Sequence, residues 1–187
     1  MQRCMVHNVL ARKTPVDLEL PWFAYAAIDF LDDFLKPHMT VCEYGSGGST
    51  LFFARRARRV FSIEDDPEWH NLILDRLQSR NIRNVTLKLC PFDFKNPDGF
   101  ENSEYLHAIP NERFDVIFID GREEWTRVRP VCFENAEKFI RKGGIIVVDD
   151  SWRYPELRQQ HSARHCQTYQ SVGPCRPGVT STDVFFY

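Results

Sequence analysis

The chain has 187 residues, of which 43% are hydrophobic and 27% are charged, and its formal net charge is −2 at pH 7. This length and composition are typical of one globular domain with a substantial core. The balanced charge and the lack of a long apolar run lead us to expect neither nucleic acid nor a membrane as a partner, and the first residues do not resemble a signal peptide. Six cysteines without a Cys-x-x-Cys pair favour reduced thiols and a cytoplasmic protein.

The first part of the chain predicts a helix, a strand and a second helix. Residues 1–20 show no periodicity and are expected to form a lead-in arm. Apolar residues then recur at three- and four-residue spacing over 21–36, with Pro21 at the first helical position. An apolar strand over 40–44 runs into a glycine-rich turn and a helix over 48–57. Such a turn lets a ligand approach the backbone, and the helix start offers unpaired N–H groups.

The second strand, 59–63, ends in an acidic cluster. Glu64 lies 19 residues after Gly45, and a crossover between parallel strands places the strand tip beside the glycine-rich turn. A carboxylate there can accept both hydroxyl groups of a ribose, which indicates an adenosine ligand, whereas its alternative role is an acid at the start of the next helix, 67–80. Asp65 or Asp66 is expected to cap that helix. The buried face of the helix is expected to contain Trp69, Leu72, Ile73 and Leu77.

The remaining strands place further acids at their ends. Strands are expected over 84–90, 114–121 and 145–148, and the last two segments are apolar enough for strands that are buried on both faces. Asp120 lies at the tip of the second of these segments, and Asp149 and Asp150 follow the third. Because open α/β sheets bind ligands at the carboxyl ends of their strands, we expect these acids at one site. The other expected elements are a short helix around 103–108, a helix over 123–141 stopped by Lys142-Gly143-Gly144, and strands over 165–171 and 182–187.

The order of these motifs resembles the class I S-adenosylmethionine-dependent methyltransferases, in particular their small stand-alone microbial members. The motifs that carry the resemblance are Glu43-x-Gly45-x-Gly47, Glu64, Ile119-Asp120-Gly121-Arg122 and Asp149-Asp150-Ser151-Trp152-Arg153. A dinucleotide fingerprint would instead have a third glycine where this chain has Thr50. The resemblance implies an α/β fold with a Rossmann-like, doubly wound sheet of seven strands, mostly parallel, in which an antiparallel strand seven is inserted between strands five and six. A single domain would cover 1–187, with the arm 1–20, the leading helix 21–36 and the cofactor-binding core 40–187.

The resemblance also implies which residues bind S-adenosylmethionine and release S-adenosylhomocysteine. The turn would line the methionine part of the cofactor, with Glu43 at its amino-acid end. Residues after the third strand would meet the adenine, Asp93 through a polar contact and Phe92 or Phe94 by packing. The expected cofactor-binding residues are Glu43, Gly45, Ser46, Gly47, Ser49, Thr50, Glu64, Asp65, Phe92, Asp93 and Asp120.

Methyl transfer from a sulfonium depends chiefly on alignment of donor and acceptor, and a hydroxyl acceptor must also lose its proton. Asp120, Asp149 and Asp150 are therefore the expected catalytic residues. In one interpretation they hold a divalent metal such as magnesium, as in catechol-type O-methyltransferases. In the interpretation that we favour no metal is assigned, Asp120 contacts the amino group of the cofactor, and Asp149 or Asp150 is the base. The residues expected to bind the acceptor are Arg122, Trp152 and Arg153.

The sequence thus predicts methyl transfer to a small molecule, at oxygen, and the arginines favour an anionic acceptor. One alternative is a nicotinamide-dependent reductase domain, against which the missing third glycine and the terminal strand count. The other alternative is a cofactor-binding protein without catalytic activity, which binding without turnover would favour.

Overall fold

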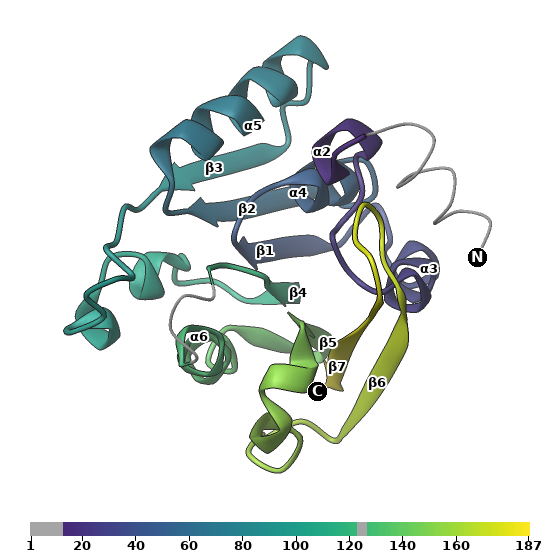
Figure 1. The fold of residues 1–187 in the computed structure, drawn as a ribbon, viewed down its shortest axis with the longest axis vertical. Coiled ribbons are helices and arrows are strands. Elements are labelled where there is room, and N and C mark those ends of the chain that lie inside the picture. Colours follow the sequence, from purple (N-terminus) through teal and green to yellow (C-terminus); the bar gives the residue numbers. More distant parts are fainter. Residues whose placement is uncertain (1–12, 123–126) are drawn as a thin grey trace.

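The computed structural model describes residues 13–122 and 127–187, and these form one seven-stranded sheet with the strand order β3-β2-β1-β4-β5-β7-β6 (Figure 1). The strands are β1 (Thr40–Tyr44), β2 (Arg59–Glu64), β3 (Val85–Leu89), β4 (Phe114–Ile119), β5 (Ile140–Asp149), β6 (His165–Val172) and β7 (Val179–Phe186). Neighbouring strands from β1 to β5 are parallel, whereas β7 is antiparallel to both β5 and β6. The expected fold class, with the last strand inserted between strands five and six, is confirmed.

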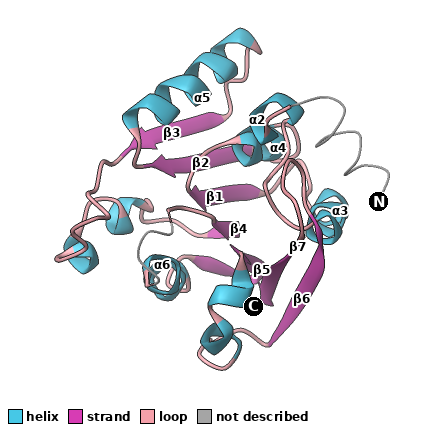
Figure 2. Ribbon diagram, viewed as in Figure 1, coloured by secondary structure: helices cyan, strands magenta, loops and turns pink. Residues whose placement is uncertain are grey.

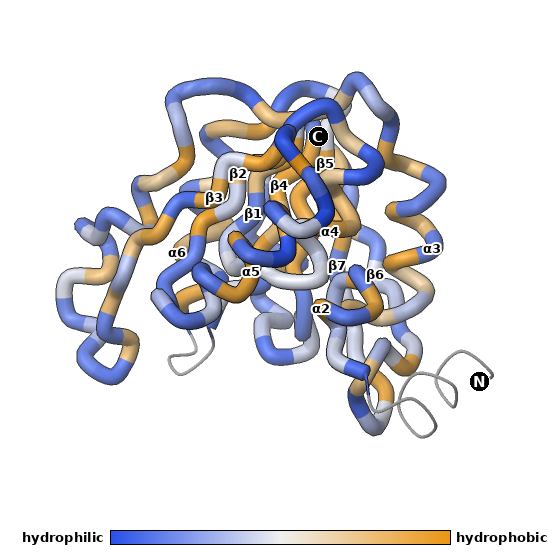
Figure 3. Tube along the Cα trace, turned by 90° about the horizontal axis from the view of Figure 1, so that it is seen from above, coloured by the Kyte–Doolittle hydropathy of each residue, from blue (hydrophilic) through white to orange (hydrophobic). Residues whose placement is uncertain are grey.

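Helices cover both faces of the sheet (Figure 2). They are α2 (Pro15–Leu18), α3 (Tyr25–Phe34), α4 (Gly48–Ala54), α5 (Pro67–Ser79) and α6 (Val128–Ala136), with 3-10 turns at Phe100–Asn102, Leu106–Ala108, Ser151–Arg153 and Pro155–Arg158. Because successive strand residues point to opposite faces, Val41 packs with α3 and α4, while Cys42 and Tyr44 pack with α6. The central strands are apolar and the surrounding loops are largely polar (Figure 3). None of the helices in the described part of the chain combines the length and the apolar character that crossing a membrane requires.

The leading helix begins later than the periodicity predicts, so its expected boundary at Pro21 is wrong. Helix α3 starts at Tyr25. The backbone N–H of Ala24 donates to the hydroxyl of Thr182 at 3.3 Å, and that of Ala26 donates to the hydroxyl of Ser171 at 3.1 Å. Two backbone N–H groups at the helix start are therefore satisfied by β7 and β6, which are distant in sequence and leave no local signal.

The expected helix over 123–141 is wrong at its carboxyl end. Helix α6 ends at Ala136, and β5 already begins at Ile140. Lys142-Gly143-Gly144 is therefore not a helix stop but an irregular part of β5. There Gly143 has a φ of +84°, and its N–H donates to the Tyr187 carbonyl at 2.8 Å. Residues 123–126 of the expected helix lie outside the described residues.

Helix α5 buries fewer residues than expected. Ile73 and Leu77 are buried, but Trp69 and Leu72 are 38% and 37% exposed. The indole Nε1 of Trp69 instead donates to the Ser46 carbonyl at 2.8 Å. Trp69 thus lies over the glycine-rich turn rather than in the core.

Candidate cofactor and active site

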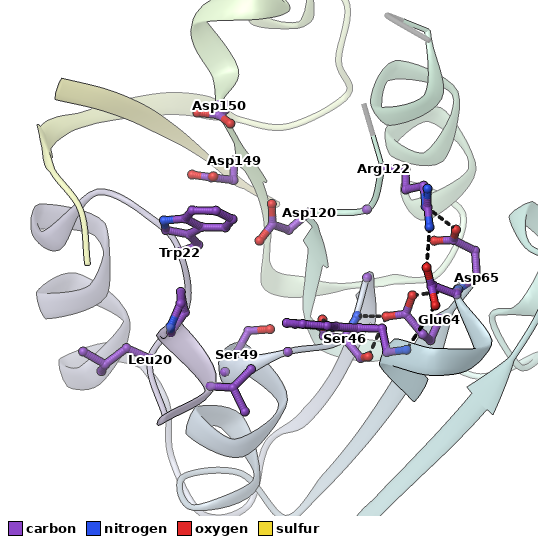
Figure 4. A pocket seen from close by; sticks show the side chains of 18 of the residues that line it. Leu20, Trp22, Ser46, Ser49, Glu64, Asp65, Asp120, Arg122, Asp149 and Asp150 are labelled. Carbon is purple, nitrogen blue, oxygen red and sulfur yellow. Dashed lines mark hydrogen bonds and ion pairs between the residues drawn. The ribbon is translucent and has the colours of Figure 1, made fainter. Parts of the chain in front are cut away.

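A pocket of about 680 Å³ lies at the carboxyl ends of β1, β2, β4 and β5 (Figure 4). Its volume falls within the range of ~300–1,000 Å³ that is usual for small-molecule and cofactor sites. The glycine-rich turn and the strand tips form one side, and the segment before α3 together with the loop between β6 and β7 forms the other. The lining includes Leu20, Trp22, Gly45, Ser46, Gly47, Ser49, Glu64, Asp65, Asp120, Arg122, Arg129, Asp149, Asp150 and Arg176.

The glycines of the turn have different roles. Gly45 has a φ of +87°, and a Cβ atom there would lie 2.7 Å from the carbonyl oxygen of Asp120. Glycine is therefore required for the tip of β4 to approach the turn. A Cβ atom on Gly47 would meet nothing closer than 4.0 Å, and its nearest neighbours are Ser49 and Trp69. The missing side chain of Gly47 leaves space in the pocket itself.

Glu43 lies behind the turn and does not line the pocket. Its side chain is buried, and its carboxylate accepts hydrogen bonds from the hydroxyls of Ser49 at 2.8 Å, Thr50 at 2.6 Å and Ser62. Burial raises the pKa of Glu43 to about 7, against the effect of these three hydrogen bonds. Thr50 is also buried, and its hydroxyl accepts the Gly47 N–H at 2.9 Å. Glu43 and Thr50 therefore hold the turn in shape.

Glu64 lines the pocket beside the turn, as the crossover geometry predicts. Its carboxylate accepts the backbone N–H and the hydroxyl of Ser46 at 2.9 and 2.6 Å. It also accepts the N–H groups of Asp65 and Asp66, both at 3.0 Å. Asp66, rather than Glu64, caps α5, because its carboxylate accepts the N–H groups of the first turn at 2.9 and 3.1 Å.

Arg122 lies at the Glu64 end of the pocket. Its guanidinium contacts Asp65 and Asp66, each at 2.6 Å. Burial raises the pKa of Asp65 to about 6, and the nearby Arg122 opposes this rise. A second pocket of about 370 Å³ is lined by the same three side chains together with Phe92 and Asp93. The residues expected at the adenine therefore lie next to Glu64, but in this adjoining pocket.

The three aspartates expected to be catalytic all line the first pocket. Buried Arg129 joins two of them, because its Nη2 lies 3.1 Å from Asp120 Oδ1 and its Nη1 donates to the Asp149 carbonyl at 2.7 Å. The carboxylate of Asp149 accepts the Thr182 hydroxyl at 2.7 Å. Burial, together with the charge of Asp120, raises the pKa of Asp149 well above its ordinary value. Within 13–122 and 127–187, no group of three or more His, Cys, Asp or Glu side chains is placed to hold a metal ion.

Asp150 differs from Asp149 in both backbone and charge. Its φ is +48°, a left-handed conformation that aspartate and asparagine tolerate better than most residues. Its carboxylate accepts the Thr180 hydroxyl at 2.7 Å and an N–H of Arg176 at 2.9 Å. Burial would raise the pKa of Asp150, but these two contacts outweigh burial, and the pKa lies below its ordinary value.

Trp152 and Arg153, which were expected to bind the acceptor, do not line the pocket. Trp152 is 56% exposed, and its Nε1 donates to Asp150 at 3.3 Å. The guanidinium carbon of Arg153 lies 4.7 Å from the centroid of the Trp152 ring. Both residues therefore lie beside the pocket, behind Asp150.

Sequence reasoning missed parts of one wall of the pocket. The arm that was expected to lack periodic structure contains α2, which begins with reciprocal hydrogen bonds between Thr14 and Asp17. A Ser/Thr-x-x-Asp/Glu pattern is a signal that would have predicted this helix start. Trp22, which falls within the expected leading helix 21–36, is 50% exposed and lines the pocket, whereas Phe23 is buried. Arg176 had no local signal at all.

Comparison with known proteins identifies the family. Residues 42–151 match the family model described as "Methyltransferase domain". The chain belongs to the class I S-adenosylmethionine-dependent methyltransferase family. A curated relative named "Probable cobalt-precorrin-6B C(15)-methyltransferase (decarboxylating)" from Methanococcus maripaludis is 28% identical over 119 residues, which is 58% of this chain. The matched region spans only 61% of that relative's length.

Solved structures show the same fold for this methyltransferase. The O-methyltransferase TomG from Streptomyces achromogenes, crystallised with S-adenosylmethionine, has a TM-score of 0.67 and 18% identity and covers 100% of this chain and 99% of its own. An rRNA methylase from Streptococcus thermophilus has a TM-score of 0.65 and 16% identity, with coverage of 93% and 97%. The family match does not support the nicotinamide-dependent reductase that was weighed as an alternative.

Proposed function

We propose that this methyltransferase transfers a methyl group from S-adenosylmethionine to a hydroxyl group of a small molecule. The observation that carries this proposal is that one pocket joins Glu64 at one end to Asp149 and Asp150 at the other (Figure 4). The first carboxylate suits the hydroxyls of a ribose, and the others suit an acceptor that must lose a proton. When bound, the cofactor supplies an electrophilic methyl group.

The Glu64 end fits an adenosine ligand. Four protein donors already surround the Glu64 carboxylate, but one of them is the Ser46 hydroxyl, which can rotate and give its place to a ribose hydroxyl. Gly47 leaves open space beside this position. Asp120 suits the amino group of the cofactor, because an ammonium is attracted to a carboxylate. Phe92 and Asp93 stay the expected adenine contacts, since their pocket adjoins Asp65.

At the other end, Asp149 is the better candidate for the base. A general base works best when its pKa lies near the working pH, and the raised pKa of Asp149 gives it the higher proton affinity of the two acids. The side chains of Leu20 and Trp22 form an apolar wall that favours a small acceptor over a nucleic acid, as does the net charge of −2. The expectation of an anionic acceptor was based on Arg122 and Arg153. Arg122 lies at the Glu64 end of the pocket, and Arg153 does not line the pocket.

We also propose a cytoplasmic location for the protein. The five cysteines among the described residues are all free, and Cys42 and Cys132 are buried in the core. Free thiols are the usual state of cysteine in a reducing compartment.

Calorimetry tests the cofactor part of the proposal. S-adenosylmethionine, S-adenosylhomocysteine and NADH are titrated separately into the wild type, Glu64→Ala and the exposed control Glu68→Ala. Binding of both sulfur compounds should weaken about 10- to 100-fold in Glu64→Ala, because hydrogen bonds to a charged group are lost, and stay unchanged in the control. Failure of both to bind the wild type would overturn the proposal.

The acceptor part needs a turnover measurement. S-adenosylhomocysteine formation is followed with a set of small hydroxyl compounds and, separately, with RNA. Turnover with a hydroxyl compound supports the proposal, and turnover with RNA alone contradicts it. Cofactor binding without turnover on any acceptor would favour the alternative of a cofactor-binding protein without catalytic activity.

A further inference from the structure

Arg176, in the loop between β6 and β7, contacts both walls of the pocket. On one side its Nη2 lies 2.9 Å from Asp150 Oδ1, and its Nη1 lies 3.8 Å from Asp149 Oδ2. On the other side its Nη1 donates to the Trp22 carbonyl at 3.4 Å, and its guanidinium carbon lies 5.9 Å from the centroid of the Trp22 ring. A single side chain therefore joins the acids to the aromatic wall.

The same loop packs against the segment that contains Trp22. The Cys175 thiol donates to the Lys13 carbonyl at 2.8 Å, and a Cβ atom on Gly173 would lie 2.6 Å from the Phe23 carbonyl oxygen. Trp22 itself is 50% exposed, so core packing alone does not fix its ring. Arg176 supplies two contacts that can hold this residue in place, a hydrogen bond to the Trp22 carbonyl and a cation over the ring.

We propose that Arg176 is the positioning residue of the acceptor end, holding the Trp22 ring opposite the carboxylates of Asp149 and Asp150. This inference rests on the proposed function. It implies an acceptor that presents a flat apolar face to Trp22 and a hydroxyl group to the acids. Aromatic rings offer a flat apolar surface, and carboxylates accept a hydroxyl proton, so the two walls select for different parts of one molecule.

A different role for Arg176 would be simple neutralisation of the two acids. A lysine would preserve that role, because it keeps the positive charge. It cannot reproduce the planar fork that reaches Asp150 and the Trp22 carbonyl together. Arg176→Lys therefore separates positioning from neutralisation.

The experiment measures how accessible Trp22 is. Acrylamide quenching of tryptophan fluorescence is recorded for the wild type, Arg176→Met and Arg176→Lys, each with and without Trp22→Phe, so that the difference isolates Trp22. The matched control is Arg158→Met, because Arg158, in the 3-10 turn Pro155–Arg158, pairs with buried Asp183 of β7 at 2.8 Å but does not line the pocket. Since Trp22 is half exposed, its release should raise its quenching constant by up to about twofold in Arg176→Met. The rise should be smaller in Arg176→Lys and absent in the control.

Unchanged quenching of Trp22 in Arg176→Lys would overturn the proposal, because it would leave neutralisation of the two acids as the role of Arg176, and so would an equal rise in Arg158→Met, which would indicate general loosening. If Arg176→Met does not fold, Arg176→Lys alone decides between these outcomes. S-adenosylhomocysteine binding is measured on the same proteins and should change less than about threefold, because the contacts of Arg176 are with Asp149, Asp150 and Trp22 and not with Glu64. If the wild type fails to bind this ligand, the proposed function fails, whereas the quenching result still reports on Arg176.

Discussion

The hydroxyl group of Tyr105 lies against Gly121, where a Cβ atom on residue 121 would overlap with it. Tyr105 is fully buried, and its hydroxyl has no hydrogen-bond partner among the described residues. The Gly121 carbonyl in turn accepts two hydrogen bonds from Arg129, at 3.1 and 2.9 Å. The small size of Gly121 therefore lets the core reach the β4 tip that carries Asp120.

Gly121→Ala should destabilise the fold by about 1–3 kcal/mol, which is the usual effect of overpacking. Tyr105→Phe alone should be neutral or slightly stabilising, because it removes an unpaired buried hydroxyl. In the double variant Gly121→Ala with Tyr105→Phe, the loss of stability caused by Gly121→Ala should largely disappear. The ring carbon that carried the hydroxyl would lie 3.5 Å from the new Cβ atom, which is an ordinary contact distance. Urea unfolding of the wild type, the two single variants and the double variant gives the coupling energy between residues 105 and 121. Additive effects of the two substitutions would contradict this account.

The strands and their tips could be predicted from the sequence because both depend on local pattern. The apolar run of β4 and the distance from Gly45 to Glu64 are enough to place an acid beside the turn. Burial of Arg129 and the contact of Arg176 with Trp22 depend on segments that meet only in the folded chain. No periodicity or spacing encodes such contacts, so the position of Arg176 against Trp22 could not be predicted in this way.

Gly45 and Gly47 should respond differently to alanine. Gly45→Ala should destabilise the fold by about 1–3 kcal/mol, because of its positive φ and the carbonyl of Asp120 at 2.7 Å. Gly47→Ala should leave the free energy of unfolding nearly unchanged, because a methyl group there meets nothing closer than 4.0 Å. It should instead weaken S-adenosylhomocysteine binding, since the methyl group takes up pocket space. Thermal melts and calorimetry on both variants check this contrast, which equal effects would refute.

Glu43 should make the protein less stable as the pH rises. Its pKa is about 7 in the folded chain and near 4.5 in the unfolded chain, so between these values the folded state holds a proton that the unfolded state has released. The stabilisation is complete below the unfolded value and is lost as the pH rises through the folded value, with a total of the order of 3 kcal/mol. Glu43→Gln does not titrate and should flatten the dependence of unfolding free energy on pH over this interval. The exposed control Glu68→Gln should retain the wild-type slope, and a steep slope in Glu43→Gln would contradict the assignment.

Asp149 should keep its proton to a higher pH than Asp150 does. Burial and the charge of Asp120 raise the pKa of Asp149, whereas Thr180 and Arg176 lower that of Asp150 despite its burial. Infrared spectra recorded as the pH is raised should therefore contain the stretching band of a protonated carboxyl group that persists to a higher pH than that of Asp150, that Asp149→Asn removes and that Asp150→Asn retains. Recording them in the Glu43→Gln background removes the contribution of that acid. Loss of the band in Asp150→Asn alone would reverse the assignment.

The same assignment predicts how turnover depends on pH. If Asp149 is the base, as proposed, it must release its proton before it can accept one from the acceptor, so kcat should rise as the pH increases toward the raised pKa of Asp149. Asp149→Asn should lose this rise together with most of the activity, typically about 10²–10⁴-fold. Asp150→Asn should retain the rise, because its side chain is ionised throughout the range. A pH profile that disappears in Asp150→Asn but persists in Asp149→Asn would make Asp150 the base.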